Sequence, residues 1–178
     1  MVSESSPAAP DDIRVRLVEL YDTALGEVYG YLVPRCGSSI LAEDLTSETF
    51  LAAADAIQHR PPDELTVDCL IGIARHKLAD HWRRKAREER LLTAVDSEPD
   101  SAGDEWDATL DAIAARRTLA ALGSHHRGAL TLRYVDGLPV RDVAECLSRT
   151  EKATEVLLVR ARAAFRAEYE LNHREGAT

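Results

Sequence analysis

The sequence predicts an all-α protein made of two small helical domains that are joined by an acidic, flexible linker. Apolar residues recur at helical spacing along most of the chain, and aromatic residues make up only 5% of it. No alternating β-branched run and no Asn-Gly turn indicates a β-hairpin. A length of 178 residues fits one large domain or two small ones. The acidic stretch described below favours two.

Two long amphipathic helices are expected before residue 60. The first covers about 12–33, with Ala24 and Val28 in its apolar stripe, and Pro34 and Gly37 end it. Residues 1–11 lack the basic start and apolar core of a secretion signal, so we expect a disordered tail there. The second helix covers about 40–57, and its expected apolar face is Leu41, Leu45, Thr49, Ala52 and Ala56, flanked by Phe50 and Ile57.

A third helix, about 66–90, changes character along its length. It begins with a core stripe that includes Leu70 and Leu78, and after Trp82 it becomes the basic run RRKAREER. Such a helix suits nucleic acid, because a basic surface attracts phosphates and an aromatic ring can stack on a base. Trp82 has two interpretations here, a base-stacking residue or a residue that plugs the core.

An acidic linker is expected at residues 93–106. The stretch has no apolar period and no basic residue, and small residues are frequent in it. Its carboxylates and those that follow are Asp96, Glu98, Asp100, Asp104, Glu105, Asp107 and Asp111. The second domain is therefore expected at 107–172. Its first two helices are predicted at about 106–122 and 124–135.

Two further helices, joined by a very short turn, are predicted between Asp136 and Phe165. Gly137 suits the left-handed end of the preceding helix, and Pro139 suits a first helical position. The turn is Ser148-Arg149-Thr150, where either Thr150 or Ser148 can cap the next helix. This pattern is typical of a helix-turn-helix, whose second helix can enter the DNA major groove. An ordinary helical hairpin with solvated charges is the alternative. The residues expected to face inward are Val140, Val143, Ala144, Leu147, Leu157, Leu158, Ala161 and Phe165.

The remaining composition excludes several classes of protein. Cys36, Cys69 and Cys146 form no CxxC pair, so reduced cytoplasmic thiols are expected rather than a disulfide framework or a metal site. No phosphate-binding glycine loop, dinucleotide fingerprint or zinc-protease motif occurs, and we expect neither an enzyme nor a cofactor. No run of about 18 apolar residues indicates membrane insertion. The net charge of −9 is unusual for a DNA-binding protein, although basic and acidic residues alternate in blocks.

Three segments in order resemble a bacterial RNA polymerase sigma factor of the small, extracytoplasmic-function (ECF) type. AEDLTSETFLAAADAI (42–57) resembles the segment that docks on the polymerase clamp helices. LIGIARHKLADHWRRKAR (70–87) resembles the segment that melts and reads the minus-ten element. LRYVDGLPVRDVAECL (132–147) with the following helix resembles the domain that reads the minus-thirty-five element. Residues 12–92 would then be a region 2-like domain, and 107–172 a region 4-like domain.

The resemblance implies a function in transcription initiation and a set of contact residues. The partners it implies are core RNA polymerase, through the clamp helices and the flap, promoter DNA, and an anti-sigma factor. The polymerase would supply the catalysis, and the acidic linker would thread its RNA channel. The implied polymerase-binding residues are Asp44, Leu45, Glu48, Thr49 and Phe50. The implied minus-ten residues are Arg75, His76, Lys77, Asp80, Trp82, Arg83 and Arg84. The implied minus-thirty-five residues are Arg149, Thr150, Lys152, Ala153, Glu155 and Arg160.

Four positions depart from the family pattern. Glu155 stands where a basic residue is usual, and Leu157 where Arg is frequent. Arg149 replaces an apolar residue, and Ser148 replaces a turn glycine. A carboxylate near phosphates weakens binding, so these departures predict an atypical or weakly held minus-thirty-five element. Two other functions stay open from the residues alone, a stand-alone helix-turn-helix regulator and a polymerase-binding decoy or adaptor that lacks promoter recognition.

Overall fold

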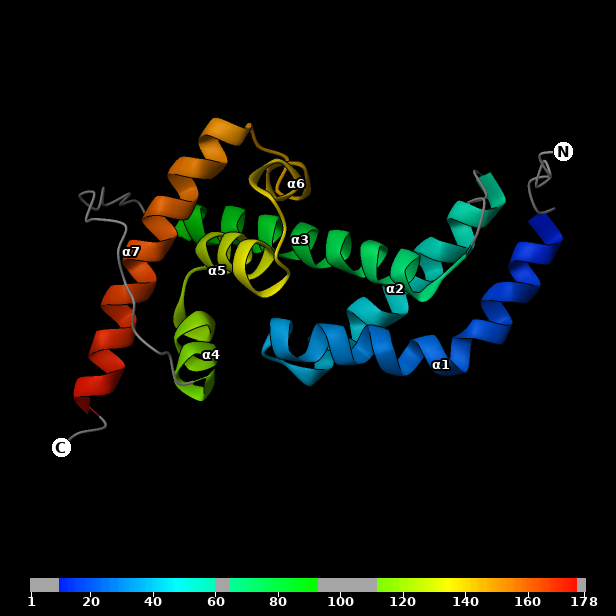
Figure 1. Ribbon diagram of the computed structural model, residues 1–178, viewed down its shortest axis with the longest axis horizontal. Coiled ribbons are helices and arrows are strands. Elements are labelled where there is room, and N and C mark those ends of the chain that lie inside the picture. Colours follow the sequence, from blue (N-terminus) through cyan, green and yellow to red (C-terminus); the bar gives the residue numbers. More distant parts are fainter. Residues whose placement is uncertain (1–9, 60–64, 93–111, 176–178) are drawn as a thin grey trace, which may run out of the picture. The chain divides into compact units, whose positions relative to one another are not determined.

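The computed structural model describes residues 10–59, 65–92 and 112–175 (Figure 1). Within these ranges every regular element is a helix, which confirms the predicted all-α class. The first three helices are α1 (Pro10–Cys36), α2 (Ser39–His59) and α3 (Val67–Leu92). The others are α4 (Ala112–Ala121), α5 (Ser124–Leu130), the π-helical turn η1 (Thr131–Val135), α6 (Val140–Cys146) and α7 (Glu151–Glu175).

Two compact units divide the chain, one formed by residues 1–78 and the other by residues 79–178. The boundary falls inside α3, so residues 67–78 of this helix belong to the first unit and residues 79–92 to the second. The domain limits predicted from the sequence remain a prediction. Residues 1–9 of the tail expected at 1–11 and the linker expected at 93–106 lie outside the described residues, whereas residues 10 and 11 belong to α1 rather than to a tail.

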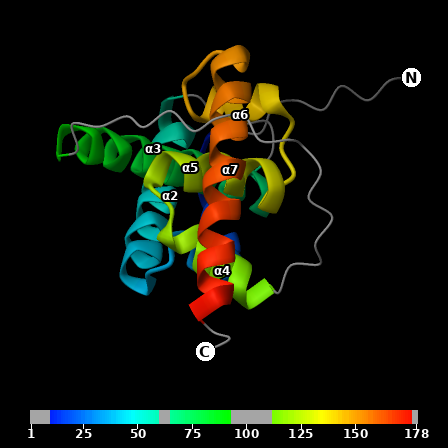
Figure 2. The same ribbon diagram turned by 90° about the vertical axis from the view of Figure 1, so that its left-hand side faces the viewer.

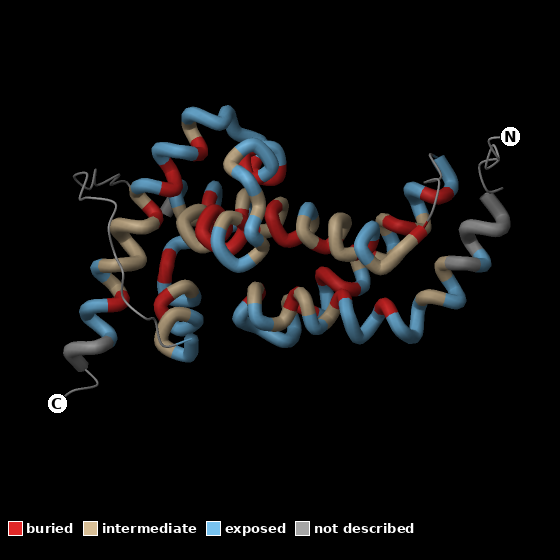
Figure 3. Tube along the Cα trace, viewed as in Figure 1, coloured by how far each residue is buried: buried red, intermediate tan, exposed pale blue. Residues whose placement is uncertain are grey.

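The first unit is built on the packing of α1 against α2. Ala24, Val28 and Leu32 of α1 are fully buried, as their helical spacing predicts. Figure 3 marks the buried residues in red. The sequence predicts that Pro34 ends α1, but the helix does not end there. A proline in the last turn removes only one backbone donor, and the helix continues to Cys36 before Gly37, at a φ of 70°, ends it.

The buried face of α2 differs from the predicted one by about one position. Leu45, Thr49 and Ile57 are buried as expected, but Ala56 is exposed, and the stripe is completed by Ala42, Thr46 and Ala53. Both stripes have helical spacing, so the sequence pattern alone could not choose between them. The buried threonines donate their hydroxyl protons to carbonyls one turn earlier, Thr46 to Ala42 at 2.6 Å and Thr49 to Leu45 at 2.7 Å.

In the second unit, α4, α5 and α6 all contact the long helix α7 (Figure 2). One core cluster joins Leu122, Leu130 and Ala161, and Leu119, Ala164 and Phe165 pack around it. The predicted helix at 124–135 is interrupted. Its second half is the π-helical turn η1, in which the N–H of Asp136 donates to the carbonyl of Thr131 at 2.9 Å. Local periodicity does not reveal such a turn.

The helix-turn-helix predicted at 136–165 is present as α6 and α7. Val143, Ala144 and Leu147 are buried, and Gly137 has a φ of 70° as expected. Of the two proposed caps, the structure has Thr150, whose Oγ1 accepts from the N–H of Ala153 at 3.2 Å. Ser148 instead occupies the left-handed region at a φ of 51°. A glycine would adopt this conformation without strain.

Candidate nucleic-acid and polymerase interface

The exposed side of α2 carries a short row of acidic and apolar side chains. Asp44 is exposed, and Leu51 is 71% exposed although it is a large apolar residue. Glu48 lies between them, and its Oε2 atom is 3.9 Å from Nζ of Lys77. Leu45 and Thr49, also implied as polymerase-binding residues, are buried in this structure and hold α2 in the core. Sequence reasoning missed Leu51, because burial of its neighbours had to be known before its exposure could be recognised.

Phe50, the fifth residue of this set, contacts α1 rather than solvent alone. Its ring lies 5.0 Å, centroid to centroid, from the ring of Tyr21, and the two planes are inclined by 58°. This tilted aromatic pair ties α2 to α1 while leaving the Tyr21 side chain 45% exposed. Phe50 is therefore half-buried and helps to hold α2 against α1.

The expected minus-ten residues of α3 fall into both compact units. Arg75, His76 and Lys77 belong to the first unit, where His76 is exposed and the other two are half-buried. Lys77 lies near Glu48 of α2, as described above. Together they place imidazole and cationic groups at the surface of the middle of α3.

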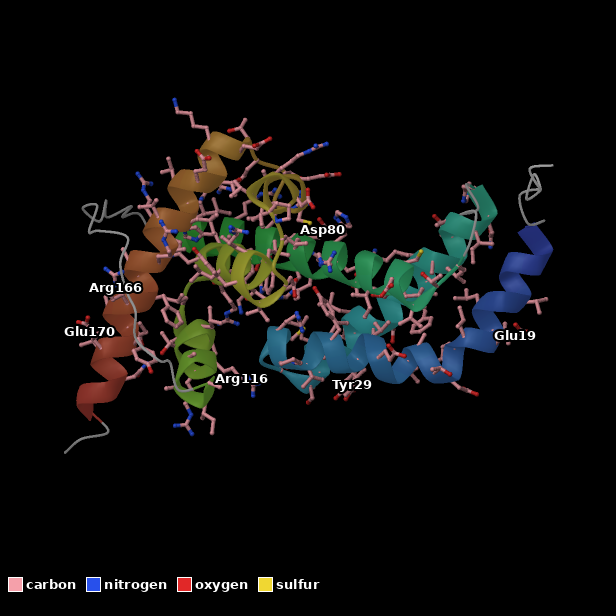
Figure 4. The ribbon with its side chains drawn as sticks, viewed as in Figure 1. Glu19, Tyr29, Asp80, Arg116, Arg166 and Glu170 are labelled. Atoms are coloured by element: carbon pink, nitrogen blue, oxygen red, sulfur yellow. The ribbon has the colours of Figure 1, made fainter. Side chains whose placement is uncertain are left out.

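The other four minus-ten residues belong to the second unit, where three of them are engaged with neighbours. Trp82 is only 2% exposed, and its indole packs against Gly128 of α5. Arg83 pairs with the carboxylate of Asp80 (Figure 4) and donates to the hydroxyl of Ser148. Arg84 is exposed. A base could stack on Trp82 only after α3 and α5 separate.

The end of α3 is attached to the start of α5 by one carboxylate. Glu89 accepts two hydrogen bonds from Ser124, one from its backbone N–H at 3.0 Å and one from its hydroxyl at 2.7 Å. A carboxylate at a helix N-terminus also interacts favourably with the helix dipole. This contact fixes the position of the neighbouring Arg90, which lines a pocket in the second unit.

A concave basic pocket lies where the end of α3, the start of α5 and the first turns of α7 meet. Its volume is about 400 Å³. Ala153, Val156 and Leu157 of α7 form its apolar wall. Its polar lining consists of Arg90, His125, Arg149, Thr150, Lys152 and Arg160. Five of the six expected minus-thirty-five residues thus surround one pocket, and Arg90 and His125 are additions that the sequence did not suggest.

Burial and neighbouring charges alter the ionisation of the histidine in this pocket. Burial is the main cause that lowers the pKa of His125 to about 4, and the adjacent His126 adds to it. The charges of Arg90 and Arg149 lower it further, whereas Glu89 raises it. Burial and then Arg90 lower the pKa of Arg149 as well. His125 is therefore neutral at pH 7, and the pocket favours an anion.

Glu155, the sixth expected minus-thirty-five residue, is exposed on α7 and does not line the pocket. Leu157, which stands where the family often has Arg, is only 6% exposed and packs in the core. The side chain at 157 is thus unavailable for a base contact. Lys152, Glu155, Val156 and Val159 are exposed near the start of α7, and Lys152 and Val156 among them also line the pocket.

The described residues contain neither a metal-type cluster nor a membrane-spanning helix. In 10–59, 65–92 and 112–175, no three or more His, Cys, Asp or Glu side chains are grouped as a metal site would require. None of the described helices is long and apolar enough to cross a membrane.

Family models match both halves of the chain. Sigma-70 region 2 matches residues 20–88, and Sigma-70 region 4 matches residues 113–165. The first match includes all of the expected polymerase-binding and minus-ten residues. The second includes the helix-turn-helix and all of the expected minus-thirty-five residues.

Curated proteins similar to this chain are described as ECF sigma factors of RNA polymerase. The ECF sigma factor BldN of Streptomyces coelicolor is 32% identical over 148 residues, which cover 80% of this chain and 56% of BldN. This chain therefore spans little more than half of that relative. The ECF sigma factor SigC of Mycobacterium tuberculosis is 33% identical over 137 residues, 67% of this chain and 70% of SigC. SigM of Bacillus subtilis is 26% identical over 85% of this chain and 93% of its own length.

One solved structure is similar in fold. It is the sigma factor RpoE of Bartonella quintana in complex with the anti-sigma factor NepR. The TM-score is 0.53 with 19% sequence identity, and the alignment covers 89% of this chain and 97% of RpoE. At this identity the likeness concerns the fold alone.

Proposed function

This chain belongs to the ECF family of bacterial RNA polymerase sigma factors, and we propose that it binds core RNA polymerase and directs promoter-specific initiation. One observation carries the proposal. A helix-turn-helix with a cationic pocket at the start of its second helix follows a region 2 match in the order that a sigma factor requires. The polymerase supplies the catalysis, and the protein acts in the cytoplasm.

Minus-thirty-five recognition would use the exposed face at the start of α7. Lys152 and Arg149 supply the positive charges that hold phosphates, while Glu155 is placed to accept from a cytosine amino group. Because a carboxylate opposes the DNA charge, this contact selects a base at the expense of affinity. An element containing cytosine opposite Glu155 is the expected preference.

Minus-ten recognition would use α3, with two kinds of residue. Arg84, Lys85 and Arg87 are exposed and available to phosphates. Trp82 packs against Gly128, so it becomes available to single-stranded bases only when α3 leaves α5, whereas Asp80 and Arg83 pair with each other on α3 and Arg83 also contacts Ser148. Promoter melting and this separation are therefore expected to occur together.

Polymerase binding would use the row Asp44, Glu48 and Leu51 on α2. An exposed leucine flanked by carboxylates is a plausible anchor, because a large apolar side chain contributes most when a partner removes it from water. The solved relative RpoE is held by an anti-sigma factor, and we propose that such a protein also regulates this chain. It would compete for the same kinds of exposed apolar residues.

Binding to purified core polymerase tests this proposal. Leu51→Asp should weaken binding about tenfold or more, because it places a charge at the centre of the contact. Leu171→Asp is the matched control, since Leu171 is 55% exposed on α7, outside the α2 row. Equal affinity of the two variants for core polymerase would show that the α2 row is not part of the interface. A wild-type protein that does not bind core at all would contradict the function itself.

A further inference from the structure

Two contacts within the second unit hold the end of α3 against α5. The indole of Trp82 is 2% exposed and packs on Gly128. One and a half to two helical turns later, the carboxylate of Glu89 accepts two hydrogen bonds from Ser124, at 3.0 Å and 2.7 Å. The first contact excludes water from an aromatic ring, and the second fixes the direction of the helix that carries it.

A third contact joins α3 to the turn of the helix-turn-helix. The guanidinium group of Arg83 donates to the hydroxyl of Ser148, which precedes α7. A turn glycine, the residue that Ser148 replaces, has no hydroxyl and could not accept this bond. The three contacts are called the α3 latch below, and they are Trp82–Gly128, Glu89–Ser124 and Arg83–Ser148.

The α3 latch engages two of the residues that are expected to read the minus-ten element. A base cannot stack on the Trp82 ring while that ring is buried, and Arg83 is occupied by Ser148. Other cations of the same helix end, Arg84 and Arg87 among them, stay exposed. The closed form therefore presents charge to a DNA backbone but no ring to an unpaired base.

We propose that the α3 latch is an autoinhibitory contact, which withholds α3 from single-stranded DNA in the free chain. The proposal rests on the proposed function in one respect, that α3 reads unpaired bases. The measured affinity for such DNA is the affinity of the open form multiplied by the fraction of molecules that are open. Loss of a latch contact therefore raises the affinity, although it adds no contact to the DNA.

The test uses the full chain without polymerase. A fluorescently labelled single-stranded oligonucleotide of mixed sequence is titrated and followed by anisotropy, and a duplex of the same sequence is titrated in parallel. Stacking on an aromatic ring requires an unpaired base, so opening of the latch should favour the single strand over the duplex. The emission of Trp82, recorded with Trp106 replaced by Phe, reports opening independently.

Glu89→Gln tests the contact with α5. Its matched control is Glu88→Gln, because Glu88 is an exposed neighbour and the two variants lose the same charge from the same helix. We expect Glu89→Gln to bind the single strand about fivefold more tightly than Glu88→Gln, the effect of weakening a charge-assisted contact. Its Trp82 emission should also be shifted to the red.

Ser148→Ala tests the contact with the turn and leaves the charge of the protein unchanged. Its matched control is Ser47→Ala, because Ser47 is an exposed serine of α2 whose hydroxyl donates within its own helix, to the carbonyl of Glu43 at 3.1 Å. A gain of about fivefold for the single strand is again expected. Circular dichroism establishes that all four variants are folded.

Tighter binding of the single strand by both latch variants, with a smaller change for the duplex, supports the proposal. Equal affinity of each latch variant and its control overturns it, and so does a lack of binding by all of them. Equal gains for single strand and duplex also overturn it, because they indicate attraction to phosphates alone. Failure of the chain to bind core polymerase is measured separately and contradicts the proposed function instead.

Discussion

Trp82 and Gly128 are in such close contact that a methyl group at position 128 would not fit. A Cβ atom placed on Gly128 would lie 2.9 Å from Cε3 of the indole and 3.2 Å from Cδ2. The glycine thus sets the distance between α3 and α5. It also determines whether the one aromatic residue expected to read single-stranded DNA is buried.

Replacement of Gly128 by alanine should loosen this contact. Overpacking against the indole is expected to cost about 1–3 kcal/mol, partly offset by about 1 kcal/mol of better helix propensity. Unfolding in urea measures the loss, and a red-shifted Trp82 emission, recorded with Trp106 replaced by Phe, reports the exposed indole. Gly72→Ala is the matched control, because Gly72 also lies inside a helix, α3, and nothing lies within 4 Å of its Cβ position. A Gly128→Ala protein as stable as the control would contradict the packing described.

Ser148 should store backbone strain in the turn of the helix-turn-helix. Ser148→Gly relieves a φ of 51° but also removes the hydroxyl that accepts from Arg83. Ser148→Ala removes the hydroxyl and keeps the Cβ atom, so the difference between the two variants is the strain minus the larger unfolded-state entropy of glycine. We expect the glycine variant to be more stable than the alanine variant by about 1 kcal/mol in urea unfolding. An alanine variant more stable than the glycine variant would contradict strain in the turn, because only the entropy of glycine would then remain.

The lowered pKa of His125 predicts a specific loss of stability in acid. The imidazole binds a proton near pH 6.5 when the chain is unfolded but only near pH 4 when it is folded, so the unfolded state takes up more protons between these values. Stability from this group is present above pH 6.5 and declines as the pH falls to about 4. The groups facing it are His126, Arg90, Arg149 and Glu89.

A His125→Gln variant tests this dependence, because glutamine stays neutral throughout. The difference in unfolding free energy between the variant and the wild type should change between pH 6.5 and 4 in favour of the variant. Comparing the two proteins cancels the carboxylates that titrate in the same range. A difference that is constant with pH would show that His125 titrates normally in the folded protein.

Glu155 should limit the affinity of α7 for DNA. Glu155→Lys exchanges a repulsive charge for an attractive one on the exposed face of the helix. We expect stronger non-specific binding and a salt dependence of log K that is steeper by about one. Glu170→Lys makes the same charge change near the far end of α7 (Figure 4) and should have a smaller effect. Identical salt slopes for both variants would place the DNA elsewhere.

Local signals predicted the helix-turn-helix well, and the contacts between distant residues hardly at all. Gly137 and Thr150 act on their own neighbours, so the end of η1 and the start of α7 could be identified from the sequence. The burial of Trp82 depends on Gly128, and nothing in the sequence around the tryptophan specifies that partner. Both of its interpretations were reasonable until the partner was known.

The candidate site was predicted in the same uneven way. The cations of the turn and of α7 were identified because a recognition helix concentrates them within a few turns. Arg90 was missed as their neighbour, since it is brought there by the attachment of Glu89 to Ser124. The buried face of α2 was misplaced because most of its buried residues are alanine or threonine, and small residues give little contrast between a core face and a solvent face.

The proposed function requires that this chain makes RNA polymerase start at chosen promoters. The most direct measurement is run-off transcription by purified core polymerase, with and without the protein, on genomic promoter fragments. We predict discrete transcripts that require the protein and whose promoters share an upstream element. Glu155→Lys should change which sequence of this element is preferred. A protein that binds core but starts no transcript would contradict the claim and indicate a decoy. A protein that binds promoter DNA without core would indicate an independent regulator.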